Sequence, residues 1–208
     1  MPHRQLFNAP RLWPLARTGA GRRRAPAFRP ALETLEERAV PAITPAHLYE
    51  LNGSLEDAYG GPALVAHGGT LADGRYTFGE HQGLSLTGAL ADTGTYSIAL
   101  VAELDTFDKF YNKVIDFQDL SSDFGLYFAG RRLQLYPGAV GADAASPNTD
   151  FLLVITRDGA TGETKTYLNG ILQQTYVGFY SEIAVPGGNV LNFFRDDRVT
   201  AHWEADSG

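Results

Sequence analysis

The segment from Phe151 to Tyr176 constrains the fold of this chain more than any other. Residues 151–156 (FLLVIT) are apolar and rich in β-branched side chains, and residues 163–168 (ETKTYL) alternate between polar and apolar after a glycine-containing turn. Asn169-Gly170 then favours a two-residue hairpin, because both central residues of such a turn need positive φ. Residues 171–176 return antiparallel. The segment therefore predicts an antiparallel meander, which serves as scaffold and carries no catalytic group.

Short strand patterns recur at regular spacing from about residue 46 onward. The 23 Gly and 11 Pro supply turns, and the 44% of hydrophobic residues are enough to bury a core. We therefore predict an all-β fold, a two-sheet antiparallel sandwich of the jelly-roll type. The further strands expected lie at residues 47–51, 75–78, 83–87, 96–104, 113–117, 125–128, 132–136, 190–194 and 199–204.

Charge divides the chain into two regions. Residues 1–40 contain eight Arg and three Glu, a net charge of +5, whereas the remainder carries −12. Residues 1–45 are rich in Arg, Pro and Ala without periodicity, so we interpret them as a disordered or processed N-terminal region preceding one domain at 46–208. An acidic domain disfavours nucleic-acid binding. It suits hydroxyl-rich ligands or divalent cations better.

Several classes of site are excluded by composition. The chain has no Cys, which removes disulfides and thiolate metal sites, and its five His form no pair with metal-ligand spacing. No stretch approaches the roughly 20 apolar residues of a transmembrane helix, so no transmembrane segment is expected. The N-terminus also lacks the unbroken apolar region of an ordinary signal peptide.

A short motif in the N-terminal region points to export. Residues 32–42, LETLEERAVPA, resemble the motif near the N-terminus of many exported and surface proteins of planctomycete bacteria. The resemblance implies a secreted or cell-surface destination in the bacterial envelope. The alternative interpretation is a short helix with an acidic face.

The order of several sequence blocks resembles a known domain family over about residues 47–208. The blocks include YELNGS at 49–54, KVIDF at 113–117, DFGLY at 123–127, YLNG at 167–170 and NFFRDD at 192–197. Together they resemble the laminin-G-like domains of the concanavalin A-like lectin and glucanase superfamily. The resemblance implies a jelly roll that binds glycan or extracellular protein without catalysis. In that family one further strand follows the segment at 204–208, so either the sequence is truncated or another element fills the gap.

The same jelly roll also carries laminarinase-type glycosidases, which use carboxylates on one strand. Glu103 and Asp105 would share a strand face here, since side chains repeat every two residues. Position 107 is Phe, and Asp108 is too short to replace the Glu of the glycosidase pattern. We therefore expect no catalytic residues and no enzyme, with a laminarinase-type hydrolase as the least favoured alternative.

A structural calcium ion is the predicted cofactor. Ca²⁺ takes six to eight oxygen ligands, often from loops. The residues that could supply them are Asp57, Asp196, Asp197 and Glu204. The alternative is that Asp196-Asp197 only forms a turn. A second acidic cluster at Asp116, Asp119 and Asp123 is interpreted as a solvated loop.

Exposed aromatic rings could stack on sugar rings, and Phe179-Tyr180, in a loop after a glycine, is the best candidate. The remaining aromatic candidates, Tyr111, Tyr127, Tyr136 and Trp203, are expected mostly in the core. The leading hypothesis is thus a recognition module that binds glycan or protein through loops at one edge of the sandwich. The alternative is a purely structural or adhesive module of a larger surface protein.

Overall fold

The computed structural model describes residues 44–107, 109–183, 189–197 and 204–205. Within these ranges the chain is all-β, and no described residue forms a helix that could cross a membrane. The fold class predicted from the sequence is confirmed. The predicted N-terminal export region lies, apart from residues 44 and 45, outside the described residues.

The larger sheet has the strand order β1-β4-β13-β6-β7-β8-β9, and β14 pairs with β6. All its neighbours are antiparallel except β14 and β6, which are parallel. Its strands are β1 (Val65–His67), β4 (Gly83–Thr87), β6 (Tyr111–Asp116), β7 (Gly125–Ala129), β8 (Arg132–Tyr136), β9 (Val140–Ala144), β13 (Val190–Phe193) and β14 (Glu204–Ala205).

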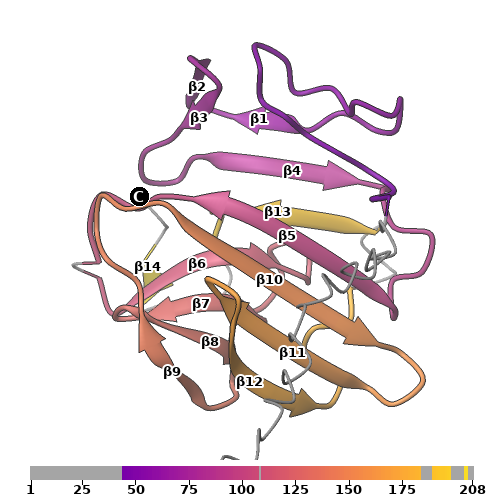
Figure 1. Cartoon of the computed structure of the whole chain (residues 1–208), viewed down its shortest axis with the longest axis vertical. Coiled ribbons are helices and arrows are strands. Elements are labelled where there is room, and N and C mark those ends of the chain that lie inside the picture. The colour runs from indigo at the N-terminus through magenta and orange to yellow at the C-terminus, as the bar shows by residue number, and fades with distance from the viewer. Residues whose placement is uncertain (1–43, 108, 184–188, 198–203, 206–208) are drawn as a thin grey trace, which may run out of the picture. The chain divides into compact units, whose positions relative to one another are not determined.

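The smaller sheet has the order β12-β11-β10-β5 and contains the predicted meander. Asn169 and Gly170 have φ of 51° and 82°, as the hairpin between β11 and β12 requires. A separate ribbon, β2 (Thr70–Ala72) with β3 (Arg75–Thr77), lies beside β1 (Figure 1). The strands of the smaller sheet are β5 (Tyr96–Ala102), β10 (Phe151–Asp158), β11 (Glu163–Leu168) and β12 (Ile171–Val177).

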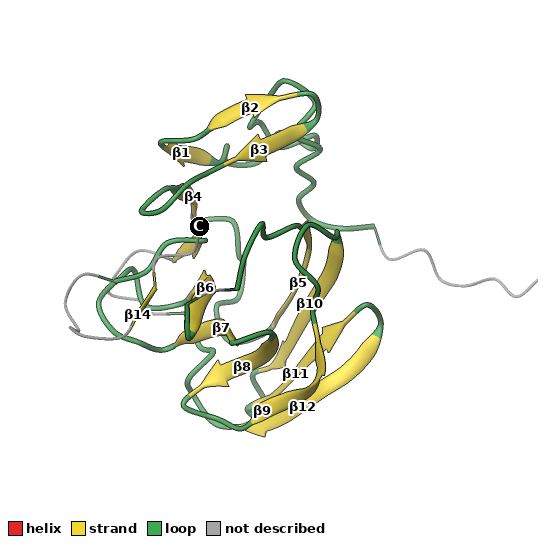
Figure 2. Ribbon diagram, turned by 90° about the vertical axis from the view of Figure 1, so that its left-hand side faces the viewer, coloured by secondary structure: helices red, strands yellow, loops and turns green. Residues whose placement is uncertain are grey.

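The two sheets face each other as the layers of a sandwich (Figure 2). Their inward side chains follow the period-2 pattern of strands, as in β10, where Phe151, Leu153 and Ile155 are at most 2% exposed. The rings of Phe128 and Phe151 meet edge to face with centroids 5.1 Å apart, which joins the centres of the two layers. The core therefore lies between β10 and the middle of the larger sheet.

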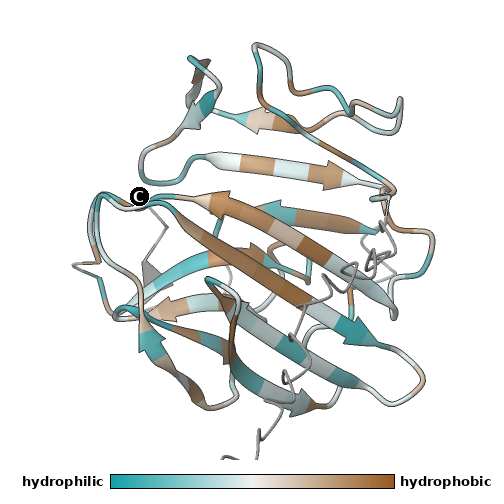
Figure 3. Ribbon diagram, in the orientation of Figure 1, coloured by the Kyte–Doolittle hydropathy of each residue, from teal (hydrophilic) through white to brown (hydrophobic). Residues whose placement is uncertain are grey.

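The two edge strands of the smaller sheet, β12 and β5, differ in how their inward side chains are covered. At β12 the sandwich is closed by glutamines: Gln173 exchanges hydrogen bonds with Asp143 of β9, and the backbone N–H of Leu135 donates to Gln174 Oε1 at 3.0 Å. At β5 the inward Ile98 and Leu100 remain half-exposed. Apolar residues dominate β5 and β10 (Figure 3).

Most predicted strands are confirmed, with local corrections. The predicted strand at 47–51 is wrong: this segment is irregular, because Leu48 N–H donates to the Asp57 side chain rather than to a strand. Strands β1, β2 and β9 were not predicted, and β5 ends at Ala102 rather than at 104. The predicted strand at 199–204 lies largely outside the described residues.

Candidate functional site

Four aromatic side chains from three segments form a contiguous surface that we call the aromatic platform: Phe124, Tyr176, Phe179 and Tyr180. The ring of Tyr180 lies in the middle, with centroid distances of 4.7 Å to Phe124, 4.7 Å to Phe179 and 5.2 Å to Tyr176. Phe179 is 61% exposed and the other three are half-buried. The sequence-predicted pair Phe179 and Tyr180 therefore belongs to a larger aromatic surface.

The side chain of Arg157 anchors the loop that carries Phe179 and Tyr180 through hydrogen bonds. Arg157 ends the inward row of β10 and is 7% exposed. Its Nη1 donates to the carbonyl oxygen of Gly178 at 2.7 Å and to Ser181 Oγ at 3.2 Å, and its Nη2 lies 3.5 Å from the Glu182 carboxylate. Charged donors make the stronger protein hydrogen bonds. The backbone on both sides of the two rings is thus anchored to the sheet.

Further contacts on the same loop complete its anchoring. The buried Tyr96 donates its hydroxyl to the carbonyl oxygen of Ser181 at 2.5 Å, and Thr164 and Ser181 share a hydroxyl hydrogen bond of 2.6 Å. A Cβ at position 178 would lie 2.5 Å from the ring of Tyr176, so a larger residue there would displace that ring of the platform. These contacts hold the loop against Tyr96 of β5 and Thr164 of β11.

The second loop of the platform, residues 117–124, is organised by Asp116. Its Oδ1 accepts hydrogen bonds from the backbone N–H groups of Gln118 at 3.3 Å and Leu120 at 2.8 Å. Asp119 and Leu120 both have positive φ, 51° and 58°, a conformation that non-glycine residues adopt only when their surroundings hold them there. Gln118 Nε2 donates to the carbonyl oxygen of Glu182 at 3.0 Å, which joins the two loops.

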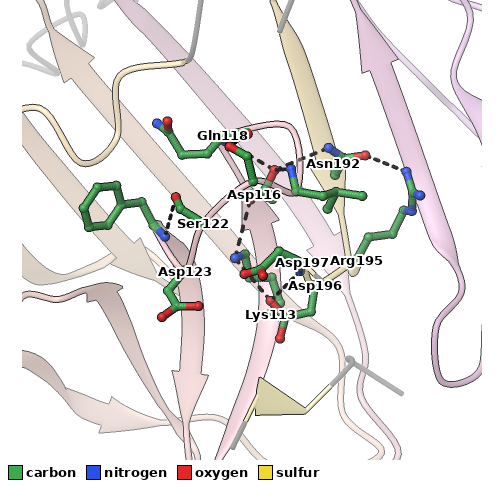
Figure 4. Close-up of polar contacts among 12 residues, drawn as sticks. Lys113, Asp116, Gln118, Ser122, Asp123, Asn192, Arg195, Asp196 and Asp197 are labelled. Atoms are coloured by element: carbon green, nitrogen blue, oxygen red, sulfur yellow. Dashed lines mark hydrogen bonds and ion pairs between the residues drawn. The ribbon is translucent and has the colours of Figure 1, made fainter. Parts of the chain in front are cut away.

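Asp116 belongs to a buried charge cluster with Lys113 and Asp196 (Figure 4). Lys113 Nζ lies 3.5 Å from Asp116 Oδ2 and 3.3 Å from Asp196 Oδ1, and it donates to Tyr127 Oη at 2.6 Å. The side chains of Lys113 and Asp116 are fully buried, and that of Asp196 is 1% exposed. Lys113 pairs with Tyr127 of β7, whereas the residues on either side of Tyr127, Leu126 and Phe128, point into the core. The cluster therefore lies on the face of the larger sheet that points away from the core.

The electrostatics of this cluster depend on Lys113. Burial raises the pKa of Asp116, and the Lys113 ammonium only partly opposes this increase. Burial likewise raises the pKa of Asp196, against the same ammonium. Lys113 is the cation that compensates both buried carboxylates. The earlier interpretation of Asp116 as part of a solvated loop is wrong, because Asp116 is the buried end of β6.

The position of the Lys113 side chain also explains why residue 125 is glycine. It passes across Gly125 of the neighbouring strand, and a Cβ at position 125 would lie 2.6 Å from Lys113 Cε and 2.7 Å from the carbonyl oxygen of Ile115. A larger residue would displace the ammonium from between its carboxylates. Gly125 therefore belongs to the same arrangement, although it carries no functional group.

Two of the predicted calcium ligands, Asp57 and Asp196, have protein partners in the structure. Each Asp57 carboxylate oxygen accepts two hydrogen bonds: Oδ1 from the N–H groups of Leu48 and Tyr59, and Oδ2 from Gly61 N–H and the His47 ring. Asp196 faces an ammonium instead. No group of three or more His, Cys, Asp or Glu in the described part of the chain is arranged to hold a metal.

Asp197 is buried beside Asp196, and the side chain of Glu204 lies outside the description. Calcium binding stays a prediction that a chelator experiment can test.

The Asp57 carboxylate instead holds the loop at residues 47–61 through these hydrogen bonds. The stability of the protein in acid should therefore depend on Asp57. Burial tends to raise the pKa of Asp57, but the hydrogen bonds from Leu48, His47, Tyr59 and Gly61 outweigh it and hold the pKa well below its usual value. A carboxyl whose pKa is lower in the folded state stabilises the fold fully above its unfolded pKa, near 4, and loses that contribution as pH falls below this value toward the lower pKa of the folded state.

We therefore expect Asp57→Asn to lower the melting temperature by several degrees at pH 7 and to make the residual stability less sensitive to acid. Thermal unfolding of both proteins between pH 7 and pH 3 measures this. Glu56→Gln, on the exposed neighbour, is the matched control and should follow the wild-type curve. Parallel curves for the wild type and Asp57→Asn would contradict the assigned role of the carboxylate.

The carboxylates considered for a glycosidase, Glu103 and Asp105, follow the end of β5. Because β5 ends at Ala102, Glu103 and Asp105 are not neighbours on one strand face as predicted. The Glu103 carboxylate lies 3.6 Å from Arg75 Nη1, Asp105 is exposed, and Asp108 is outside the described residues. The arrangement offers an ion pair rather than an assembled pair of catalytic carboxylates.

Sequence reasoning missed Phe124 and Tyr176 in the platform, and Lys113 and Arg157 beneath it. Tyr176 ends a strand that was expected to serve only as scaffold. The signal available for Arg157 was its place in the inward register of an otherwise apolar strand, where a charge needs a partner. No comparable local signal marks Phe124, because its neighbours in the platform come from residues 176–180.

Comparison with solved structures finds the same architecture. Domain 4 of AbnA, a GH43 extracellular arabinanase from Geobacillus stearothermophilus solved with arabinotriose, matches 78% of this chain and 86% of its own, with 16% identity and a TM-score of 0.56. The CBM40 of Ruminococcus gnavus IT-sialidase, bound to α2,3 sialyllactose, matches 62% of this chain and 83% of its own, with 13% identity and a TM-score of 0.46. No protein-family model and no curated protein sequence matches. The first likeness is one of fold, a β-sandwich of the jelly-roll kind.

Proposed function

We propose that this chain is a non-catalytic carbohydrate-recognition module that binds glycan on the aromatic platform. The observation that carries the proposal is Phe179, an exposed ring on a loop that is anchored by buried hydrogen bonds to Arg157. A solvent-exposed aromatic on a rigid loop offers an apolar face for stacking at little cost in conformational entropy. The fold shared with a domain solved with arabinotriose supports the same proposal.

The proposal includes the setting of the module. A laminin-G-like domain of a secreted or cell-surface protein would use this platform, at the edge of its sandwich, to hold its parent protein against a polysaccharide or glycoprotein. The export-type motif at residues 32–42 supports that location. The hydroxyl-rich surface of such a ligand also suits an acidic domain, since carboxylates accept hydrogen bonds from hydroxyl groups.

A glycan array probed with the full chain, followed by titration calorimetry on each glycan bound, tests the proposal. We expect Phe179→Ala to weaken the Kd of a bound glycan by about tenfold or more, as truncation of a central aromatic contact does at other interfaces. Phe110→Ala is the matched control, because Phe110 is 68% exposed and contacts Tyr111 rather than the platform. Equal losses for both variants would exclude a specific role for the platform.

Two measurements made with Ca²⁺ and with chelator test the calcium prediction independently: the same array and the melting temperature of the protein. A melting temperature and a binding profile that do not respond to chelator would reject a structural calcium ion. Both readouts are needed, because an ion can stabilise a fold without touching its ligand.

A structural or adhesive module is the second candidate, and the half-exposed inward side chains of β5 favour it. An edge strand of this kind, YSIALVA, carries no charge and no proline to discourage pairing with another strand. This candidate predicts no measurable affinity for any sugar. The array therefore separates the two functions.

A further inference from the structure

We infer that the ligand of the platform is a neutral saccharide, and that the site discriminates against sialylated, uronic and sulfated glycans. This inference rests on the proposed function and names the class of ligand within it. It is carried by the distribution of charge over the two loops that build the platform.

The charged side chains of the two platform loops are all acidic. Residues 117–124 (FQDLSSDF) contain Asp119 and Asp123, and residues 176–183 (YVGFYSEI) contain Glu182, with no Lys, Arg or His in either segment. Asp119 is exposed, and the Glu182 side chain is 51% exposed. The hydrogen bond from Gln118 to the Glu182 carbonyl oxygen brings the two acidic loops together beside the rings.

The cations beneath these loops do not reach a ligand. Arg157 is 7% exposed, and its Nη1 and Nη2 groups are directed at Gly178, Ser181 and Glu182. Lys113 is fully buried between Asp116 and Asp196. Neither side chain could pair with a carboxylate or sulfate on a bound glycan without leaving buried carboxylates or carbonyl groups unpaired. Arg157 and Lys113 are therefore internal, whereas Asp119 and Glu182 are exposed to solvent.

These observations fix the chemistry of the ligand. Ionised Asp119 and Glu182 only accept hydrogen bonds, so they match sugar hydroxyls, which donate them. An anionic group on the glycan would instead approach these like charges, and the buried cation of this region, Arg157, is already paired with Glu182. At distances of about 4–6 Å near a surface, such repulsion is large enough to change affinity about tenfold or more.

The test uses glycans paired by charge on the full chain: lactose against α2,3-sialyllactose, and a galacturonide trisaccharide against its methyl ester. Arabinotriose is included as a further neutral probe. We expect binding only among neutral glycans, or at least about tenfold tighter binding of the neutral member of a pair. The Asp119→Asn/Glu182→Gln variant should reduce that ratio, because the amides keep the shape but remove the charge. High salt should reduce it as well.

Each outcome decides the inference. An anionic glycan that binds as tightly as its neutral partner overturns it and leaves the proposed function standing. A preference that is unchanged in Asp119→Asn/Glu182→Gln also overturns it, since the selectivity then comes from shape. Failure of every glycan to bind overturns both the inference and the proposed function. Circular dichroism of the variant confirms that the fold is retained.

Discussion

Replacing Lys113 by methionine is expected to lower the free energy of unfolding by about 3–5 kcal/mol, which is a large part of the total for a domain of this size. Methionine keeps most of the length of the side chain but removes the ammonium. Asp116 and Asp196, both buried, would then lack the cation that lies within 3.5 Å of each. Urea unfolding followed by tryptophan and tyrosine fluorescence measures the loss.

Lys165→Met is the matched control, because Lys165 pairs with Glu163 at the surface and is 37% exposed. Exposed pairs contribute about 0–1 kcal/mol, so this variant should unfold close to the wild type. A triple variant, Lys113→Met with Asp116→Asn and Asp196→Asn, should recover part of the loss, since no uncompensated carboxylate remains. Equal stability of Lys113→Met and wild type would show that the cluster does not depend on the ammonium.

The second large effect is expected from Arg157→Met. The variant removes the donor that holds the Gly178 carbonyl oxygen and Ser181 Oγ, and we expect it to cost about 2–4 kcal/mol, as charged hydrogen bonds do when one partner is lost. Release of the loop should also displace Phe179 and Tyr180. Under the proposed function, glycan affinity therefore falls at temperatures where the variant is still folded.

Near-ultraviolet circular dichroism reports the packing of the platform rings separately from global unfolding. Arg75→Met provides the control, since Arg75 is 58% exposed and bridges Asp150 and Glu103 at the surface. We expect little change in stability and none in the platform for this control. If Arg157→Met keeps both the ring signal and the affinity, the loop is held by other contacts.

The sheet architecture could be predicted from the sequence because its signals are local. Alternation along β10 and β11 and the Asn169-Gly170 turn specify a meander without reference to the rest of the chain. Two of the three missed strands, β1 and β9, are three and five residues long and mostly exposed. Their pairing with β4 and β8, rather than an apolar pattern, defines them. The segment 47–51 has a strand-like pattern, but hydrogen bonds to Asp57 determine its conformation.

The candidate site was less predictable because it is assembled from distant segments. Phe179 and Tyr180 stood out as aromatics in a loop after a glycine, whereas Phe124 reaches them from more than 50 residues earlier. Lys113 reads locally as an ordinary polar residue of a strand. Lys113 is buried because β6 pairs with β7 and because the later segment that contains Asp196 packs against it. No pattern in residues 111–116 indicates that this distant segment packs there.

The anchoring of the platform has a consequence for protein engineering. Arg157 binds the loop through the Gly178 carbonyl oxygen and Ser181, and Asp116 binds the other loop through the amides of Gln118 and Leu120. None of these bonds uses the rings of Phe124 or Phe179. Positions 124 and 179 can therefore be randomised as a library while the frame beneath them is unchanged. The domain offers a cysteine-free scaffold from which binders for other saccharides can be selected.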